Sequence, residues 1–189
     1  MTNGHEIDHW VEWWHKGWWV NMDDSWKNHA VFQLPKQAIK QISMHHASEM
    51  SHVFGVPDSL PPPVHLRILK IINLNTQERA SLLHIIHEMC FPHQRQFTFS
   101  SAEKINYRRI SRALRCEKWL CADYSTSGEA TALVLLRELS MENWPRLRFS
   151  FDKHNIQQSE LMTPNESIHP GRLNALWESA LWNLPQYGN

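Results

Sequence analysis

Apolar residues recur along most of the chain at spacings of three and four, which is the pattern of helices that bury one face. Close to the amino terminus this stripe contains Ile7, Trp10, Trp13, Trp14 and Trp18. Glu12, His15 and Lys16 fall on the opposite face, and Trp19 lies off the stripe. The pattern predicts a helix over residues 7–18.

Glycine and proline divide the next part of the chain. A second helix is predicted over residues 36–54, because Gly55 and Pro57 follow it. The stretch 59–64, SLPPPV, is a stiff hinge that a helix cannot enter, although a helix can begin directly after it. A third helix is therefore predicted over 64–72.

Capping patterns mark three further helix starts, each with Ser, Thr or Asn three residues before Glu. The pairs are Asn75 with Glu78, Ser100 with Glu103, and Thr126 with Glu129. They predict helices over about 76–90, 101–121 and 128–140.

The carboxyl-terminal third adds a short extended segment and a last helix. After Trp144-Pro145, residues 147–151 alternate apolar and polar side chains, which predicts a strand or extended segment. A helix over about 170–184 would place Leu173, Leu176, Trp177, Ala180, Leu181 and Leu184 on one face. We expect a mainly α fold, a compact helical domain of about six to seven helices. A Trp-rich segment, residues 1–35, is expected to pack on a main domain formed by residues 36–189.

From charge and cysteine usage we expect a cytoplasmic protein without a strong overall field. Lys plus Arg and Asp plus Glu number 19 each, so no overall field attracts nucleic acid or anionic lipid. Cys90, Cys116 and Cys121 lack CxxC spacing, which indicates free thiols in a reducing compartment. We find no secretory signal and no apolar run long enough for a membrane span, so we expect no membrane insertion.

The 13 histidines raise the alternative of a metal site. The best cluster contains His84, His87, Glu88, Cys90 and His93. Two histidines three residues apart on a helix can share one ion. However, the apolar pattern of this helix places Cys90 on the buried face and points His84 and Glu88 almost opposite to it. We therefore expect no metal and no cofactor, with a small His-rich metal-binding protein or metal-dependent enzyme as the alternative.

Sequence patterns of catalysis are absent. No GxSxG nucleophile turn and no glycine-rich phosphate loop occurs, and no pair of carboxylates stands out as an acid and base couple. We expect a protein that is not an enzyme and has no catalytic residues.

One basic stripe indicates a binding surface. Arg108, Arg112 and Arg115 recur at spacings of four and three within YRRISRALRCEKW. The stripe is either a solvated polar face or a docking strip for an acidic protein, because guanidinium groups pair with carboxylates bidentately. A DNA-binding regulator is a further alternative, which the zero net charge disfavours.

Three local patterns resemble the SctK family of type III secretion sorting-platform accessory proteins, which includes YscK, OrgA and MxiK. In the first, WWVN at 18–21 leads to Trp26, His29 and Leu34-Pro35, without the proline usual in that turn. The second is the leucine-rich LRILKIINLNTQERASLLHIIHEMC. The third is LLRELSMENWPRLRFSF, followed by the closing LWESALWNLP.

This resemblance implies a non-enzymatic adaptor at the cytoplasmic face of the inner membrane. Such proteins link the cytoplasmic domain of the inner-membrane ring protein, SctD-like, to the pod protein of the sorting platform, SctQ-like. The family carries no catalytic residues, so none is transferred to this chain.

Six of the ten tryptophans lie between residues 10 and 26. Six such rings on a surface without a partner would favour aggregation. We expect Trp10, Trp14 and Trp18 to anchor the helix, and Trp13, Trp19 or Trp26 to be shared with a partner. The alternative is that all six are internal packing.

Overall fold

The computed structural model describes residues 3–94, 97–120, 124, 128–163 and 168–185. The structure is 72% helical, and its described residues form no strand, which confirms the mainly α class with more helices than expected. Two compact units are present: unit 1 contains residues 1–73 and 140–154, and unit 2 contains residues 74–139 and 155–189. The units therefore do not divide at the boundary expected near residue 35.

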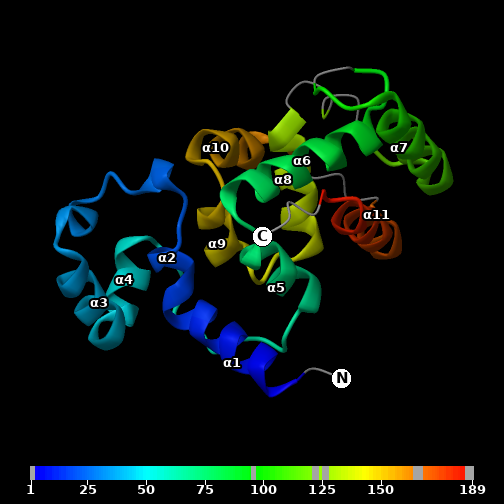
Figure 1. Cartoon of the computed structure of the whole chain (residues 1–189). Helices are drawn as coiled ribbons and strands as arrows, with labels where there is room; N and C mark the ends of the chain where they lie inside the picture. The colour runs from blue at the N-terminus through cyan, green and yellow to red at the C-terminus, as the bar shows by residue number, and fades with distance from the viewer. Residues whose placement is uncertain (1–2, 95–96, 121–123, 125–127, 164–167, 186–189) are drawn as a thin grey trace. The chain divides into compact units, whose positions relative to one another are not determined.

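Unit 1 begins with a helix that changes its winding. Helix α1 (Gly4–Glu12) runs into a π-helical turn (Trp13–Gly17) and then into α2 (Trp18–Val20) (Figure 1). In the π turn the N–H of Trp18 bonds to the carbonyl of Trp13, one residue further back than in an α-helix. The wider turn shifts the following side chains, and Trp19 is fully buried although it lies off the α-helical stripe. In contrast, Ile7 is 45% exposed.

The predicted helix over 36–54 consists of two helices. Helix α3 (Lys36–His45) ends at His46, which has φ −130° and ψ 34°, and α4 (Ala47–Val53) follows and packs against α3 (Figure 1). Helix α5 (Leu66–Asn73) begins after the proline hinge, as expected.

The prediction of an extended segment over 147–151 is wrong. Helix α9 (Trp144–Leu147) runs into a 3₁₀ turn (Arg148–Ser150), and only Phe151 is extended. Pro145 occupies the first turn of α9, where its missing N–H costs nothing and its fixed φ favours the helix. The alternating apolar residues are all buried, because a tight turn also places them in the core of unit 1.

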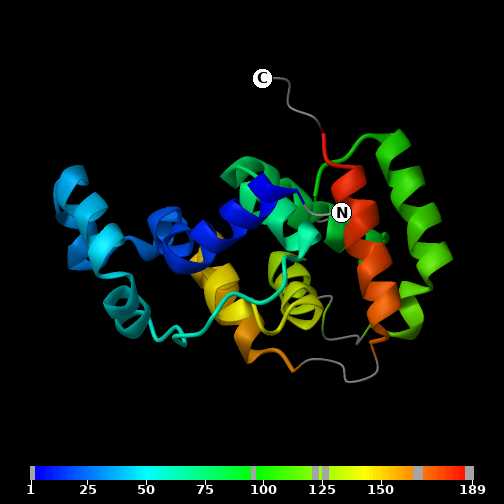
Figure 2. The same ribbon diagram turned by 90° about the horizontal axis from the view of Figure 1, so that it is seen from below.

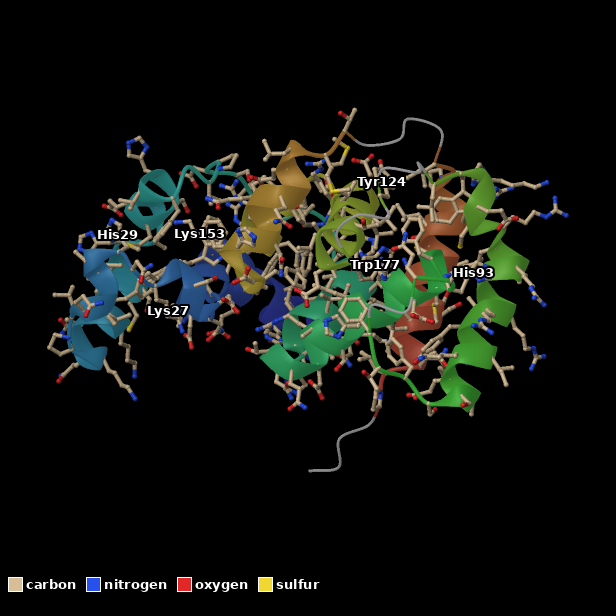
Figure 3. The ribbon with its side chains drawn as sticks, turned by 90° about the horizontal axis from the view of Figure 1, so that it is seen from above. Lys27, His29, His93, Tyr124, Lys153 and Trp177 are labelled. Carbon is tan, nitrogen blue, oxygen red and sulfur yellow. The ribbon has the colours of Figure 1, made fainter. Side chains whose placement is uncertain are left out.

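Unit 2 is a helical bundle built around α6 (Thr76–Cys90), which contacts three other helices of the unit. These are α7 (Ser101–Leu114), α8 (Gly128–Leu139) and α11 (Pro170–Trp182). Figure 2 shows α7 and α11 side by side, and Trp177 lies among the helices (Figure 3). Helix α10 (Lys153–Leu161) has no counterpart in the sequence prediction.

Capping determines where the helices of unit 2 begin. The boxes of Asn75 with Glu78 and of Ser100 with Glu103 are both formed, which confirms the predicted starts of α6 and α7. Thr126 lies outside the described residues. Helix α7 ends at Leu114 rather than near 121, because Arg115 adopts the left-handed conformation with φ 54°.

No described helix combines the length and the apolar character that crossing a bilayer requires.

Candidate functional site

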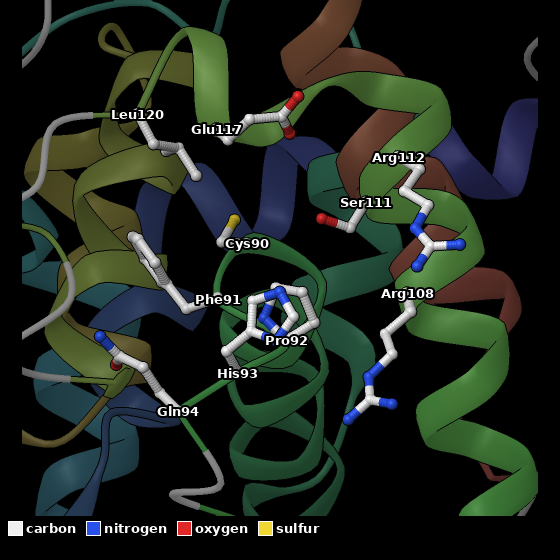
Figure 4. A pocket seen from close by; sticks show the side chains of 10 residues that line it. All are labelled: Cys90, Phe91, Pro92, His93, Gln94, Arg108, Ser111, Arg112, Glu117 and Leu120. Atoms are coloured by element: carbon white, nitrogen blue, oxygen red, sulfur yellow. The ribbon is translucent and has the colours of Figure 1, made fainter.

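A cavity of about 550 Å³ opens in unit 2 between α7 and the chain that follows α6 (Figure 4). It is lined by Cys90, Phe91, Pro92, His93, Gln94, Arg108, Ser111, Arg112, Glu117 and Leu120. Its volume lies within the roughly 300–1,000 Å³ typical of ligand pockets. The cavity is therefore the candidate site.

Helix α7 supplies one wall. Positions 108, 111 and 112 lie on one flank of the helix because they are three and four residues apart. Ser111 is buried, Arg108 is half-buried and Arg112 is exposed. Both guanidinium groups lie on the same side of the cavity (Figure 4), and neither has a hydrogen-bonded or ion-paired carboxylate among the described residues. This wall offers two cations for an incoming anion.

The opposite wall is formed where α6 ends. Pro92 cannot continue a helix, and the preceding residue, Phe91, has φ −131° and ψ 63°. The chain turns at this point and brings His93 to the side of the cavity near α7 (Figures 3 and 4). Leu120 and Glu117 complete the lining at another end, so most of the apolar surface faces the arginines across the cavity.

The carboxyl group of Glu88 is buried close enough to Arg108 of α7 to interact with it electrostatically. Glu88 is 1% exposed, and neither of its oxygens has a hydrogen-bond partner among the described atoms. Burial raises the pKa of this carboxyl, and the positive charges of Lys104, Arg108 and His93 oppose the rise. The expectation that Glu88 points away from the buried face is wrong, since α6 is covered by helices on more than one side.

His84 and His87, which belong to the candidate metal cluster, contact aromatic rings and a carboxylate. His87 is fully buried next to the rings of Phe91 and Phe97, and burial lowers its pKa to about 4. His84 contacts Glu129, with 2.7 Å between Nε2 and Oε1, and stacks on Phe97. No group of three or more His, Cys, Asp or Glu within the described ranges could hold a metal ion.

Two free thiols are buried beside each other, and one of them, that of Cys90, lines the cavity. The other is that of Cys116. Burial raises the pKa of Cys90, whereas the hydrogen bond from Cys90 lowers that of Cys116. The sequence prediction of free thiols therefore agrees with the structure for these two, while Cys121 lies outside the described residues.

The predicted partner-binding residues fall into different environments. Arg108 and Arg112 meet at the cavity, but Arg115 forms the left-handed end of α7 and does not line it. Trp13 and Trp19 are 4% and 0% exposed, so in this state they have almost no surface for a partner. Trp26 is half-buried and donates its indole N–H to the carbonyl of Phe151 at 2.8 Å. Most of the six rings are internal packing.

Sequence reasoning missed the most exposed tryptophan. Trp182 is 89% exposed on α11, whereas Trp177 of the same helix is fully buried. The signal was present, because position 182 lies off the apolar stripe of this helix.

Comparison with protein families, with curated proteins and with solved structures found no match.

Proposed function

We propose that this protein is a non-enzymatic adaptor that holds an acidic partner protein at the wall formed by Arg108 and Arg112. The observation that carries this proposal is the pair of guanidinium groups beside a partly apolar cavity, with no carboxylate bonded to either among the described residues. A planar guanidinium pairs with a carboxylate through two parallel hydrogen bonds, which makes arginine a frequent contact residue in interfaces.

The resemblance to the SctK family indicates which kind of complex we propose. The partners would be the pod protein of a type III secretion sorting platform and the cytoplasmic domain of the inner-membrane ring protein. The adaptor would then work at the cytoplasmic face of the inner membrane. No catalytic step is required of any residue in this role.

The test is capture of partners from the cells that produce this protein. The tagged protein is isolated in mild detergent, and the retained proteins are identified by mass spectrometry. We expect a pod-like and an inner-membrane ring component with the wild type, and loss of at least one with Arg108→Glu combined with Arg112→Glu. Arg109→Glu, on the exposed side of the same helix and outside the cavity lining, is the matched control.

Two outcomes would contradict the proposal. One is the absence of both components when the cells are shown to express them. The other is equal retention by the double variant and by Arg109→Glu. Far-ultraviolet circular dichroism of each variant verifies that the helices are intact, since all three positions lie in α7.

A further inference from the structure

We propose that the cavity receives one large apolar side chain of the partner, from a short acidic segment whose carboxylates pair with Arg108 and Arg112. This inference rests on the proposed function and specifies the chemistry of the docked segment. It also assigns a role to the cavity, which the arginine stripe alone does not require.

The lining divides into two chemical halves. Phe91, Pro92 and Leu120 present apolar surface, and the thiol of Cys90 also lines the cavity. The cations lie together on α7, and Arg112 is exposed. A segment with a single ring or branched aliphatic chain would bury it against the apolar half while its flanking carboxylates stay near α7. Anchoring of this kind concentrates binding energy in a few residues.

The lining favours a peptide over a compact anion. Arg108 and Arg112 contribute two positive charges on α7, and Glu117 lies at another end of the cavity. A compact anion close to the arginines would leave the apolar half of the cavity unfilled. A peptide can satisfy both halves, because its backbone holds the carboxylates apart from the apolar side chain and directs them to one wall.

Burial of Arg108 strengthens the pairing. Its Nε is buried without a hydrogen-bond partner among the described atoms, and the buried carboxyl of Glu88 is close enough to interact electrostatically. An incoming carboxylate would pair with the terminal nitrogens of a guanidinium on a half-buried side chain, where water screens less than at an open surface.

The experiment uses two fluorescein-labelled peptides, Gly-Asp-Glu-Phe-Glu-Asp-Gly and the same peptide with Ala in place of Phe. Binding to the full chain is followed by fluorescence anisotropy at low salt. We expect the Phe peptide to bind at least roughly tenfold more tightly than the Ala peptide, from the area of one buried ring. Arg112→Gln should weaken both peptides by a similar factor, and Arg109→Gln should change neither.

A double-mutant cycle locates the ring. Leu120→Ala should weaken the Phe peptide several-fold and leave the Ala peptide unchanged, because only the Phe ring contacts the apolar half. Equal affinity of the two peptides, or absence of binding by both, would overturn the inference. Displacement of both peptides by millimolar inorganic phosphate would also overturn it and would identify a simple anion site.

Failure of this inference can be separated from failure of the proposed function. If the partners are captured and are lost with the Arg108 and Arg112 variants, but the peptides do not discriminate, the adaptor role stands and the cavity is not its anchor. If no partner is captured while the peptides discriminate, the cavity binds acidic segments but the sorting-platform role fails.

Discussion

The guanidinium carbon of Arg146 lies 3.9 Å from the centroid of the Trp14 indole ring, although 132 positions separate the two residues. The Nε of Arg146 donates to the carbonyl of Trp14 at 3.0 Å, and one terminal nitrogen donates to the carbonyl of Pro57 at 2.8 Å. This carbonyl lies in the π turn, where the N–H of Trp18 bonds to the carbonyl of Trp13. One cation therefore connects three segments of unit 1.

Removing this cation should destabilise unit 1. Arg146 is 3% exposed, and Arg146→Ala would leave buried carbonyl groups without donors and a space above the Trp14 ring. We expect the free energy of unfolding to fall by about 3 kcal/mol or more, measured by urea unfolding followed by tryptophan fluorescence. Arg146→Lys should lose an intermediate amount, because an ammonium group cannot reproduce the planar fork.

The exposed Arg109 provides the control, since Arg109→Ala should change the free energy of unfolding by less than about 0.5 kcal/mol. A loss below about 1 kcal/mol for Arg146→Ala would show that the contacts of Arg146 do not hold unit 1 together.

Local signals in the sequence predicted the helices whose ends are determined locally. The capping boxes at Asn75 and Ser100 act within three residues, and both starts were correct. The break at His46 and the turn after Pro145 were not predicted, because both depend on tertiary packing within unit 1 and not on neighbouring residues in the sequence. The π turn also escaped prediction, since one extra residue per turn leaves no mark on the apolar spacing before it.

The same distinction holds for the candidate site. Spacing alone was enough to predict that Arg108 and Arg112 lie together, because four residues make about one helical turn. It failed for Arg115, where the helix ends in a left-handed residue. It also failed for Glu88, because this polar residue was assigned to the outside of a helix that lies at the centre of its unit.

Two glycines should respond to alanine with opposite signs. Gly17 has right-handed helical angles, and a Cβ there would meet the side chain of Trp13 at 3.4 Å, an ordinary contact. We expect Gly17→Ala to stabilise the protein by roughly 0.5–1 kcal/mol. Gly55 has φ +65°, so Gly55→Ala should cost about 1 kcal/mol. Urea unfolding of both variants provides the comparison, and a destabilised Gly17→Ala would show that the π turn cannot accept a methyl group.

Burial of His87 should make the protein less stable in mild acid. Its pKa is lowered to about 4 in the folded state, against 6.5 for an ordinary histidine. Between these values the unfolded chain binds a proton that the folded chain does not, so stability rises with pH. The contribution of His87 is complete above about pH 6.5 and is lost as the pH falls towards 4. Over this window we expect a loss of up to roughly 3 kcal/mol, measured by urea unfolding at each pH.

The comparison of wild type with His87→Leu isolates this effect. Glu88 has the opposite dependence, because its raised pKa favours folding at low pH, and it is present in both proteins. The difference in unfolding free energy between wild type and variant should change across pH 4–6.5 and be flat above it. A constant difference between wild type and His87→Leu over the whole range would mean that His87 titrates normally.

Two tryptophans of α11 should differ sharply in what they contribute to folding. Trp177 is fully buried in unit 2, so Trp177→Ala should cost roughly 3–5 kcal/mol through the cavity that it leaves. Trp182 is 89% exposed, and Trp182→Ala should change the free energy of unfolding by less than about 0.5 kcal/mol. Iodide quenching gives a second measurement, because only an exposed ring meets the ion, and the quenchable fluorescence should fall with Trp182→Ala. If Trp182→Ala instead destabilises the protein as much as Trp177→Ala, its ring is buried in solution, and α11 packs on a face that the structure leaves open.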